Sequence, residues 1–206
     1  MTLTRPLVTL ACLVGFAGQS ISAPVMISSG SFSGSATLIG FEALAQDAEI
    51  TSQFSSAGVV FSGGLHADKT ASNVDDFSAA GSVIAANFSA NGLNAFGQIE
   101  ATFATAVTRV GFLGVTVGNL TVEAFRGGSS LGIFNFATDP NPPDVFVGLE
   151  DFAGIDRIVV SAAYPYFEFD DFRFETAAAD VPEPGSLALA SLGLLGLAVS
   201  RRLRRC

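Results

Sequence analysis

Carboxylates are the side chains of this sequence best suited to chemistry. Calcium takes about six to eight hard oxygen ligands, which carboxylates and backbone carbonyls supply. Glu42 ends an expected early strand, whereas Asp170 and Asp171 lie in the last one, so pairing of these strands would bring them together. Asp47 and the carbonyls near it would complete the shell. The sequence therefore predicts a structural calcium site with these four ligands, although it contains no Asp-x-Asp-x-Asp-Gly loop.

Nucleophilic and zinc chemistry have few residues to work with. His66 is the only histidine and stands in a loop-like stretch after two glycines, while Cys12 and Cys206 lie at the two ends of the chain. A lone histidine without cysteine makes a poor zinc site, and no Gly-x-Ser-x-Gly motif is present. Asp and Glu pairs leave a glycosidase open as an alternative, but the sequence has no tryptophan to support a sugar ring. We therefore expect a protein that is not an enzyme.

The net charge of −9 is unevenly distributed along the 206 residues. All 19 acidic residues and only five of the 10 basic ones lie within 24–184, which gives this part a charge of −14. An acidic body repels phosphate backbones, so no nucleic acid is expected as a partner. With 49% apolar residues, the chain also differs from a disordered acidic protein.

Residues 1–23 have the layout of a secretory signal peptide. Arg5 supplies an early positive charge, an apolar run follows, and small residues suited to cleavage come after it. The run is too short to span a bilayer comfortably. We expect the Sec translocon and a signal peptidase to act on this segment, with cleavage after Ser20, Ser22 or Ala23.

The C-terminal segment predicts a membrane anchor. Pro182, Glu183 and Pro184 precede an uncharged apolar run, which we interpret as a transmembrane helix at residues 185–200. A basic tail at 201–206 follows this run. Because positive charge stays on the cytoplasmic side, the tail is expected inside and the acidic body outside, as the signal peptide also predicts. The cytoplasmic basic cluster consists of Arg201, Arg202, Arg204 and Arg205.

This combination resembles the PEP-CTERM sorting signal of Gram-negative bacteria. The resemblance covers residues 181–206 and rests on the Pro-Glu-Pro motif, the apolar run and the arginine cluster in a chain with a signal peptide. It implies processing by an exosortase, a membrane-embedded, transpeptidase-like cysteine protease. It also implies a precursor anchored in the inner membrane and a product at the cell surface or in an exopolysaccharide matrix. The alternative is a plain single-span anchor with an incidental Pro-Glu-Pro.

One all-β domain is expected at residues 36–176, after a Ser- and Gly-rich lead-in at 24–35 and before a linker at 177–184. Short apolar runs between turn signals, without helical crossovers, favour an antiparallel β-sandwich. The clearest hairpin has a glycine-containing turn at 127–130, and 42–54 is expected to be a loop with at most one helical turn. The predicted strands are 36–42, 58–62, 83–87, 95–103, 107–117, 120–126, 131–138, 145–148, 155–162 and 166–174.

The last predicted strand changes its pattern in the middle. Phe167 and Phe169 occupy odd positions, whereas Phe172 and Phe174 occupy even ones. Since successive side chains of a regular strand point to opposite faces, all four rings reach one core only through a bulge at 170–171. We predict this bulge, with one of its two carboxylates held inward or to the side. The alternative leaves one phenylalanine pair on the opposite face.

The body also resembles a jelly-roll-like β-sandwich module found ahead of PEP-CTERM tails. This resemblance implies kinship with carbohydrate-binding-like jelly rolls, some of which hold a structural calcium between their first and last strands. The stretches that carry it are Ile39-Gly40-Phe41-Glu42, Gly58-Val59-Val60-Phe61-Ser62, Phe146-Val147-Gly148-Leu149, Ile155-Asp156-Arg157-Ile158 and Phe169–Phe174.

From the residues and the resemblance together we expect a non-enzymatic exported protein of the cell surface or the biofilm matrix. Its acidic sandwich is expected to associate with exopolysaccharide. One alternative is a membrane-anchored adhesin that keeps its tail. Another is a secreted glycosidase that uses two carboxylates.

Overall fold

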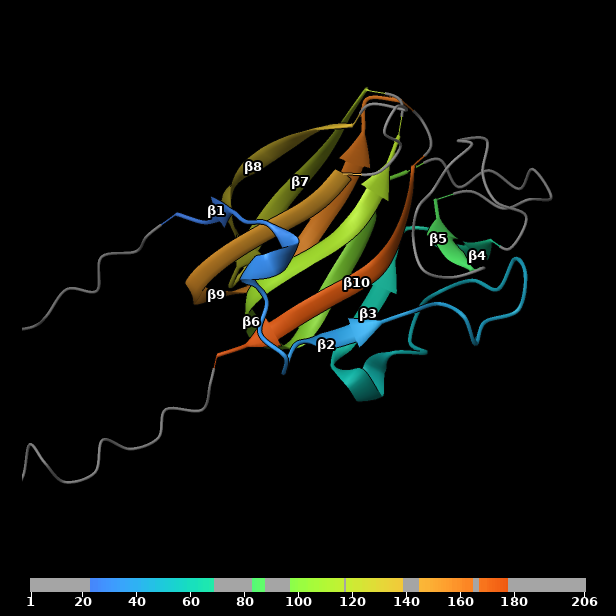
Figure 1. Ribbon diagram of the computed structural model, residues 1–206, viewed down its shortest axis with the longest axis horizontal. Helices are drawn as coiled ribbons and strands as arrows, with labels where there is room; N and C mark the ends of the chain where they lie inside the picture. Colours follow the sequence, from blue (N-terminus) through green and yellow to red (C-terminus); the bar gives the residue numbers. More distant parts are fainter. Residues whose placement is uncertain are drawn as a thin grey trace, which may run out of the picture.

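The computed structural model of the chain describes residues 23–68, 83–87, 97–116, 118–138, 145–164 and 167–177 (Figure 1). Nearly all of the predicted signal peptide lies outside these residues, as do the Pro-Glu-Pro motif, the predicted transmembrane helix and the arginine cluster. Within the described residues, no helix has the length and apolar character that crossing a membrane requires.

Strands make up nearly all of the regular structure in the described ranges, together with two 3-10 turns, η1 (Ser29–Ser31) and η2 (Ser55–Ala57). All pairings between the strands are antiparallel. The order across the sheet is β4-β5-β10-β6-β9-β7-β8, with β1 beside β9, β2 beside β10 and β3 beside β6. The strands are β1 (Val25–Met26), β2 (Thr37–Ile39), β3 (Val59–Ser62), β4 (His66–Asp68), β5 (Ile84–Ala86), β6 (Ile99–Val115), β7 (Gly118–Arg126), β8 (Ser129–Thr138), β9 (Val145–Ala162) and β10 (Glu168–Thr176).

Two long strands, β6 and β9, connect the two layers of the body. Their shared ladder is interrupted between Thr102 and Arg109; before this corner it is flanked by β3 and β7, and after it by β10 and β1. Side chains from both halves enter one core, so the sheet folds over and buries its inner faces. In Figure 1, β7 and β8 form the more distant layer behind β9 and β10. The prediction of an all-β, antiparallel, sandwich-like body is confirmed, whereas the jelly-roll assignment stays a prediction.

Two pairs of predicted strands are single strands in the structure. The predicted 95–103 and 107–117 join as β6, and 145–148 and 155–162 join as β9. The turn-like residues between them mark the corner of the folded sheet, through which each strand continues. The loop-like expectation for His66 is also wrong, because His66 begins β4 and pairs with β5. Strands of two or three residues, such as β1 and β4, are too short to show a sequence pattern.

The predicted β7–β8 hairpin is confirmed, with a turn two residues shorter than the predicted 127–130. The two strands pair up to Arg126 and Ser129, so that Gly127 and Gly128 form a two-residue turn. Both glycines have positive φ angles, of 57° and 78°, which a side chain would disfavour.

Phenylalanine rings fill much of the core. The ring centroids of Phe61 and Phe172 lie 5.1 Å apart in an edge-to-face contact, and those of Phe112 and Phe169 lie 5.2 Å apart. Fully burying each ring contributes about 1.5–3 kcal/mol to stability, and such ring contacts add about 0.5–1.5 kcal/mol. The largest fully buried side chains include Phe41, Phe61, Phe112, Phe167, Phe169 and Phe172.

The predicted bulge of β10 is confirmed. The register of β10 against β6 shifts between Asp170 and Arg173, and Asp171 has a left-handed φ of 51°. Asp170 is buried and accepts a hydrogen bond from the backbone N–H of Asp171 at 2.7 Å. Asp171 is half-buried and pairs with Arg173 at 3.3 Å. The bulge thus lets the phenylalanines on both of its sides face the core: Phe167, Phe169, Phe172 and Phe174 are all buried.

Candidate functional site

A pocket of about 430 Å³ opens at the end of the sandwich where β10 ends. The lead-in to β2, the corner of β6 and β9, and the last residues of β10 surround it. Its lining combines hydroxyl, charged and aromatic side chains, and we call it the Arg109 pocket. The lining residues are Ser33, Ser35, Thr108, Arg109, Phe152, Glu175, Thr176 and Ala177.

Three charged residues on the neighbouring strands β9, β6 and β10 lie in a row at this pocket, and we call them the Arg109 row. Arg109 of β6 is paired in register with Glu150 of β9 on one side and with Glu175 of β10 on the other. Directly paired residues of antiparallel strands point to the same face, and opposite charges at such positions attract. The strand register therefore places a cation between two carboxylates, with one negative charge in excess.

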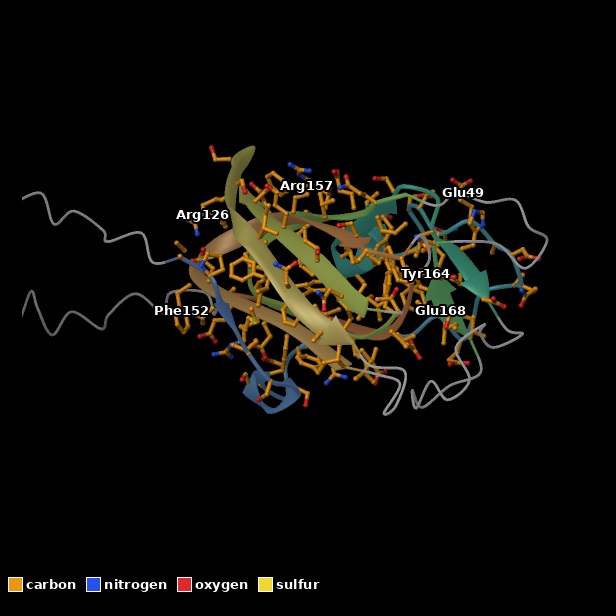
Figure 2. The ribbon with its side chains drawn as sticks, turned by 90° about the horizontal axis from the view of Figure 1, so that it is seen from above. Glu49, Arg126, Phe152, Arg157, Tyr164 and Glu168 are labelled. Carbon is orange, nitrogen blue, oxygen red and sulfur yellow. The ribbon has the colours of Figure 1, made fainter. Side chains whose placement is uncertain are left out.

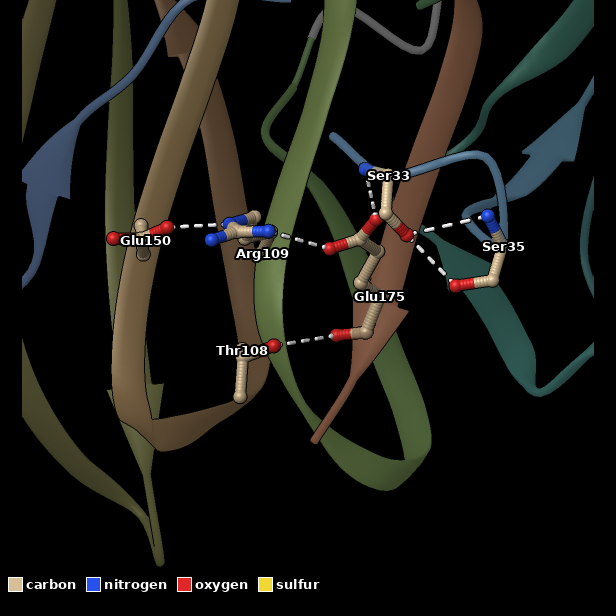
Figure 3. A network of polar contacts seen from close by, with 6 residues as sticks. All are labelled: Ser33, Ser35, Thr108, Arg109, Glu150 and Glu175. Carbon is tan, nitrogen blue, oxygen red and sulfur yellow. Dashed lines mark hydrogen bonds and ion pairs between the residues drawn. The ribbon is translucent and has the colours of Figure 1, made fainter. Parts of the chain in front are cut away.

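Hydrogen bonds fix this row, as Figure 3 shows. Arg109 donates from Nε to Glu150 and from Nη1 to Glu175 Oε2, the latter at 2.9 Å. The backbone N–H of Ser33 donates to the other oxygen of Glu175. Thr108 Oγ1 donates to the backbone oxygen of Glu175 at 3.3 Å, so the end of β10 is held from two sides.

These contacts shift two pKa values in the direction of full ionisation. The pKa of Arg109 lies above its usual value, mainly because Glu150 accepts its hydrogen bond, while burial opposes this rise. Burial alone would raise the pKa of Glu175, but the hydrogen bonds from Ser33 and Arg109 outweigh it and lower this pKa. The pocket therefore presents charged, acceptor-rich groups at neutral pH.

The corner of β9 presents an aromatic ring beside this row. Asp151 is 3% exposed and forms an ion pair with Arg126 of β7. Arg126 also donates from Nε to the backbone oxygen of Gly154 at 2.7 Å, and Asp151 accepts from the N–H of Ala153 at 2.9 Å. These contacts, which we call the corner clamp, fix the corner of β9 in a conformation that leaves the side chain of Phe152 exposed.

Phe152 is 74% exposed, and the centre of its ring lies 6.0 Å from the guanidinium carbon of Arg109. In Figure 2, its side chain lies at one end of the body, away from Glu168. Ligand sites commonly combine aromatic side chains with a few fixed polar groups. The ring offers an apolar face, and the carboxylates and hydroxyls offer hydrogen-bond acceptors.

The residues predicted to bind calcium divide between different environments. Glu42 and Asp170 lie close enough for the charge of Glu42 to affect Asp170, whose pKa is raised to about 6, mainly by burial. Asp171 pairs with Arg173 instead. Asp47 has a left-handed φ of 60°, and its backbone oxygen lies 3.3 Å from Nδ1 of His66.

No group of three or more His, Cys, Asp or Glu side chains within the described ranges is arranged to hold a metal ion. The calcium site therefore stays a prediction, supported in the structure only by the proximity of Glu42 and Asp170.

Sequence reasoning did not find the Arg109 pocket. Arg109, Glu150 and Glu175 are far apart along the chain and form no motif, so only the strand register unites them. The sequence contains a weak signal for Phe152, because this residue follows Asp151 and precedes Ala153-Gly154 where a turn is expected. Glu168 was also missed: its side chain is fully buried on the face of β10 opposite the core phenylalanines.

Four chains of solved structures match this chain, and two of them resemble the fold as follows. The K2 cleaved adhesin domain of Lys-gingipain (Kgp) is 15% identical, with a TM-score of 0.47, and the match covers 70% of this chain and all of that one. The catalytic domain of a GH87 alpha-1,3-glucanase, solved in complex with tetrasaccharides, is 11% identical, with a TM-score of 0.32 over 81% of this chain and 31% of that one. At these scores neither likeness bears on function. No curated protein matches the chain.

A family model described as the PEP-CTERM protein-sorting motif matches residues 180–205. The match includes Pro182, Glu183 and Pro184 together with the arginines that follow the apolar run. It confirms the resemblance found in the sequence and implies an exported protein that is sorted by an exosortase. The chain thus carries a PEP-CTERM protein-sorting motif behind a sandwich-like, all-β body.

Proposed function

We propose that this chain is a non-enzymatic protein of the cell surface or extracellular matrix that associates with exopolysaccharide through the Arg109 pocket. The observation that carries the proposal is the exposed ring of Phe152 beside a fixed row of carboxylates and hydroxyls. Sugar rings have apolar C–H faces and many hydroxyl donors, and this pocket offers a partner for each. Export through the sorting motif would deliver the sandwich to the place where such polymers occur.

The charge of the pocket favours a neutral saccharide over an acidic one. Arg109 is already engaged by Glu150 and Glu175, which leaves one negative charge in excess. The surrounding body, with its charge of −14 over residues 24–184, would repel uronic-acid or sulfated polymers. The oxygens of Glu150 and Glu175 would accept hydrogen bonds from sugar hydroxyls, and such charge-assisted bonds are the stronger kind.

The titration of the carboxylates supports binding over hydrolysis. A glycosidase needs a carboxylic acid that keeps its proton near neutral pH and a second carboxylate opposite it. In the Arg109 pocket the pKa of Glu175 is lowered. Among the described residues, the carboxyl groups with raised pKa values are those of Glu168 and Asp170, which are buried elsewhere in the sheet. We therefore expect no release of reducing sugar from any polymer that binds.

Binding of the full chain to polysaccharide tests this proposal. The chain should sediment with the producing bacterium's own exopolysaccharide and with a neutral glucan, but not with a polyuronate. Phe152→Ala should weaken binding about tenfold, because the stacking surface is lost. Val60→Ala is the matched control, since Val60 is 41% exposed on β3 and does not line the pocket.

Two outcomes would contradict the proposal. Unchanged binding by the Phe152 variant would mean that the pocket is not the site. Reducing sugar produced by the wild-type chain would mean that the protein is an enzyme.

A further inference from the structure

β8 is a ten-residue strand at the end of the sheet order. Its inner edge pairs with β7 along the whole hairpin, and none of the other described strands pairs with its outer edge. In Figure 1, β8 borders the upper left of the body, and in Figure 2 it crosses the front with no other ribbon over it. Within the described part of the chain, no strand therefore occupies this outer row of backbone N–H and C=O groups.

β8 lacks charge, proline and shortness, three features by which proteins protect such an edge, and a bulge at Leu131 is the one protecting feature it has. Exposed edges are usually short or carry charge, lysine above all, or proline. The sequence of β8, SSLGIFNFAT, has no charge and no proline, and it spans roughly 34 Å at the usual rise per residue. The other terminal strands among the described residues are short: β1 has two residues, β2 and β4 have three each, and β3 has four.

Charge favours a second copy of this chain as the occupant. The β7–β8 hairpin carries one acid, Glu123, and one base, Arg126, so its net charge is zero, whereas residues 24–184 carry −14. Two copies therefore repel one another over most of their surface and can approach most easily at this hairpin. An antiparallel strand edge is complementary to itself, because a two-fold axis brings each donor opposite an acceptor.

We propose that β8 pairs in an antiparallel manner with β8 of a second copy, about a two-fold axis near Ile133. Ile133 is 61% exposed and lies near the middle of the strand. Pairing would place the two Ile133 side chains next to each other and join the two sheets into one. Asn135, also exposed, would lie opposite Leu131 of the second copy.

The oligomeric state of the full chain in mild detergent, measured by sedimentation over a range of concentrations, tests this interface. The wild-type chain should be a dimer in equilibrium with its monomer. Ile133→Lys should raise the dissociation constant at least about tenfold, because two like charges would lie side by side. Leu38→Lys is the matched control: Leu38 is 57% exposed on β2, and its substitution adds the same charge away from β8.

A cysteine variant identifies the strand directly. In a background with Cys12 and Cys206 replaced by serine, Ile133→Cys should form a disulfide-linked dimer on mild oxidation, and Leu38→Cys should not. The interface is refuted if the wild-type chain is monomeric at every concentration, or if both lysine variants leave the dimer unchanged. Equal cross-linking of both cysteine variants would also refute it.

Discussion

Glu168 lies in β10 between two core phenylalanines, so its side chain points to the opposite face of the sheet, where it is 0% exposed. Both of its carboxylate oxygens lack a hydrogen-bond partner in the described part of the chain. Burial, and after it the charge of Asp68, raises the pKa of Glu168 to about 8. Ala86 of β5 pairs with Glu168 on one side and with His66 of β4 on the other. The side chains of His66 and Glu168 therefore lie on the same face of the sheet. At neutral pH the Glu168 carboxyl group therefore keeps its proton, which avoids an uncompensated buried charge.

This burial predicts that the protein loses stability as the pH rises. The folded state holds the Glu168 proton up to about pH 8, whereas an unfolded chain releases it near the ordinary glutamate pKa of 4.5. The folded state thus binds more protons between these values, and the free energy of unfolding should fall by on the order of 1 kcal/mol per pH unit. Asp170, with a pKa of about 6, adds a similar decline up to that pH.

Denaturant unfolding at pH 5, 6, 7 and 8 measures this dependence. Glu168→Gln keeps the size of the side chain without its charge, so most of the decline between pH 6 and 8 should disappear. Glu123→Gln on β7, which is only half-buried, should retain the decline of the wild type. Equal wild-type stability at pH 6 and pH 8 would show that Glu168 ionises freely.

At the scale of elements, the corner of β9 determines where the exposed ring of Phe152 lies. The ion pair between Arg126 and Asp151 joins β7 to this corner, and its acidic partner is almost fully buried. Gly154 adopts a φ of 99°, and a side chain there would come within 2.9 Å of Ala106. The corner is therefore a rigid support for Phe152.

Arg126→Ala should destabilise the protein by about 2 kcal/mol, because it leaves the Asp151 carboxylate buried without its cation. Arg173→Ala removes a more exposed pair with Asp171 and should cost no more than about 1 kcal/mol. Thermal unfolding of the two variants gives the comparison. If the two losses are equal, the corner clamp has no special role.

Some elements could be predicted from local sequence patterns, whereas others depend on the pairing of strands that are distant in the sequence. The bulge of β10 was visible because the parity of Phe167, Phe169, Phe172 and Phe174 changes within eight residues. The β7–β8 turn was visible because two glycines stand between alternating runs. The corners of β6 and β9 could not be predicted, because a strand that continues around a corner looks like two strands in the sequence. The Arg109 row depends on the pairing of three separate strands, and no local pattern encodes that pairing.

At the scale of the whole molecule, the sorting motif at residues 180–205 predicts that the chain is cleaved near its C-terminus. Mass spectrometry of the intact protein from the cell surface and the medium should give a C-terminus near residues 182–185. A product that still contains residues 187–206 in the membrane fraction would contradict processing. The alternative of an anchored adhesin would then be favoured.

The position of the Arg109 pocket has a mechanical consequence. Thr176 and Ala177, which line the pocket, are also the residues at which the body leads into the segment before the sorting motif. If a polymer were bound in the pocket and the chain were attached at that segment, a stretching force between them would pass only through the end of β10 and the strands beside it. Of the core phenylalanines of β10, Phe174 stands next to this path, and Phe169 and Phe172 lie farther from the end of the strand. This force would act on the contacts of the Arg109 row and not on the rest of the sandwich. The fold would therefore stay intact under forces that detach the polymer.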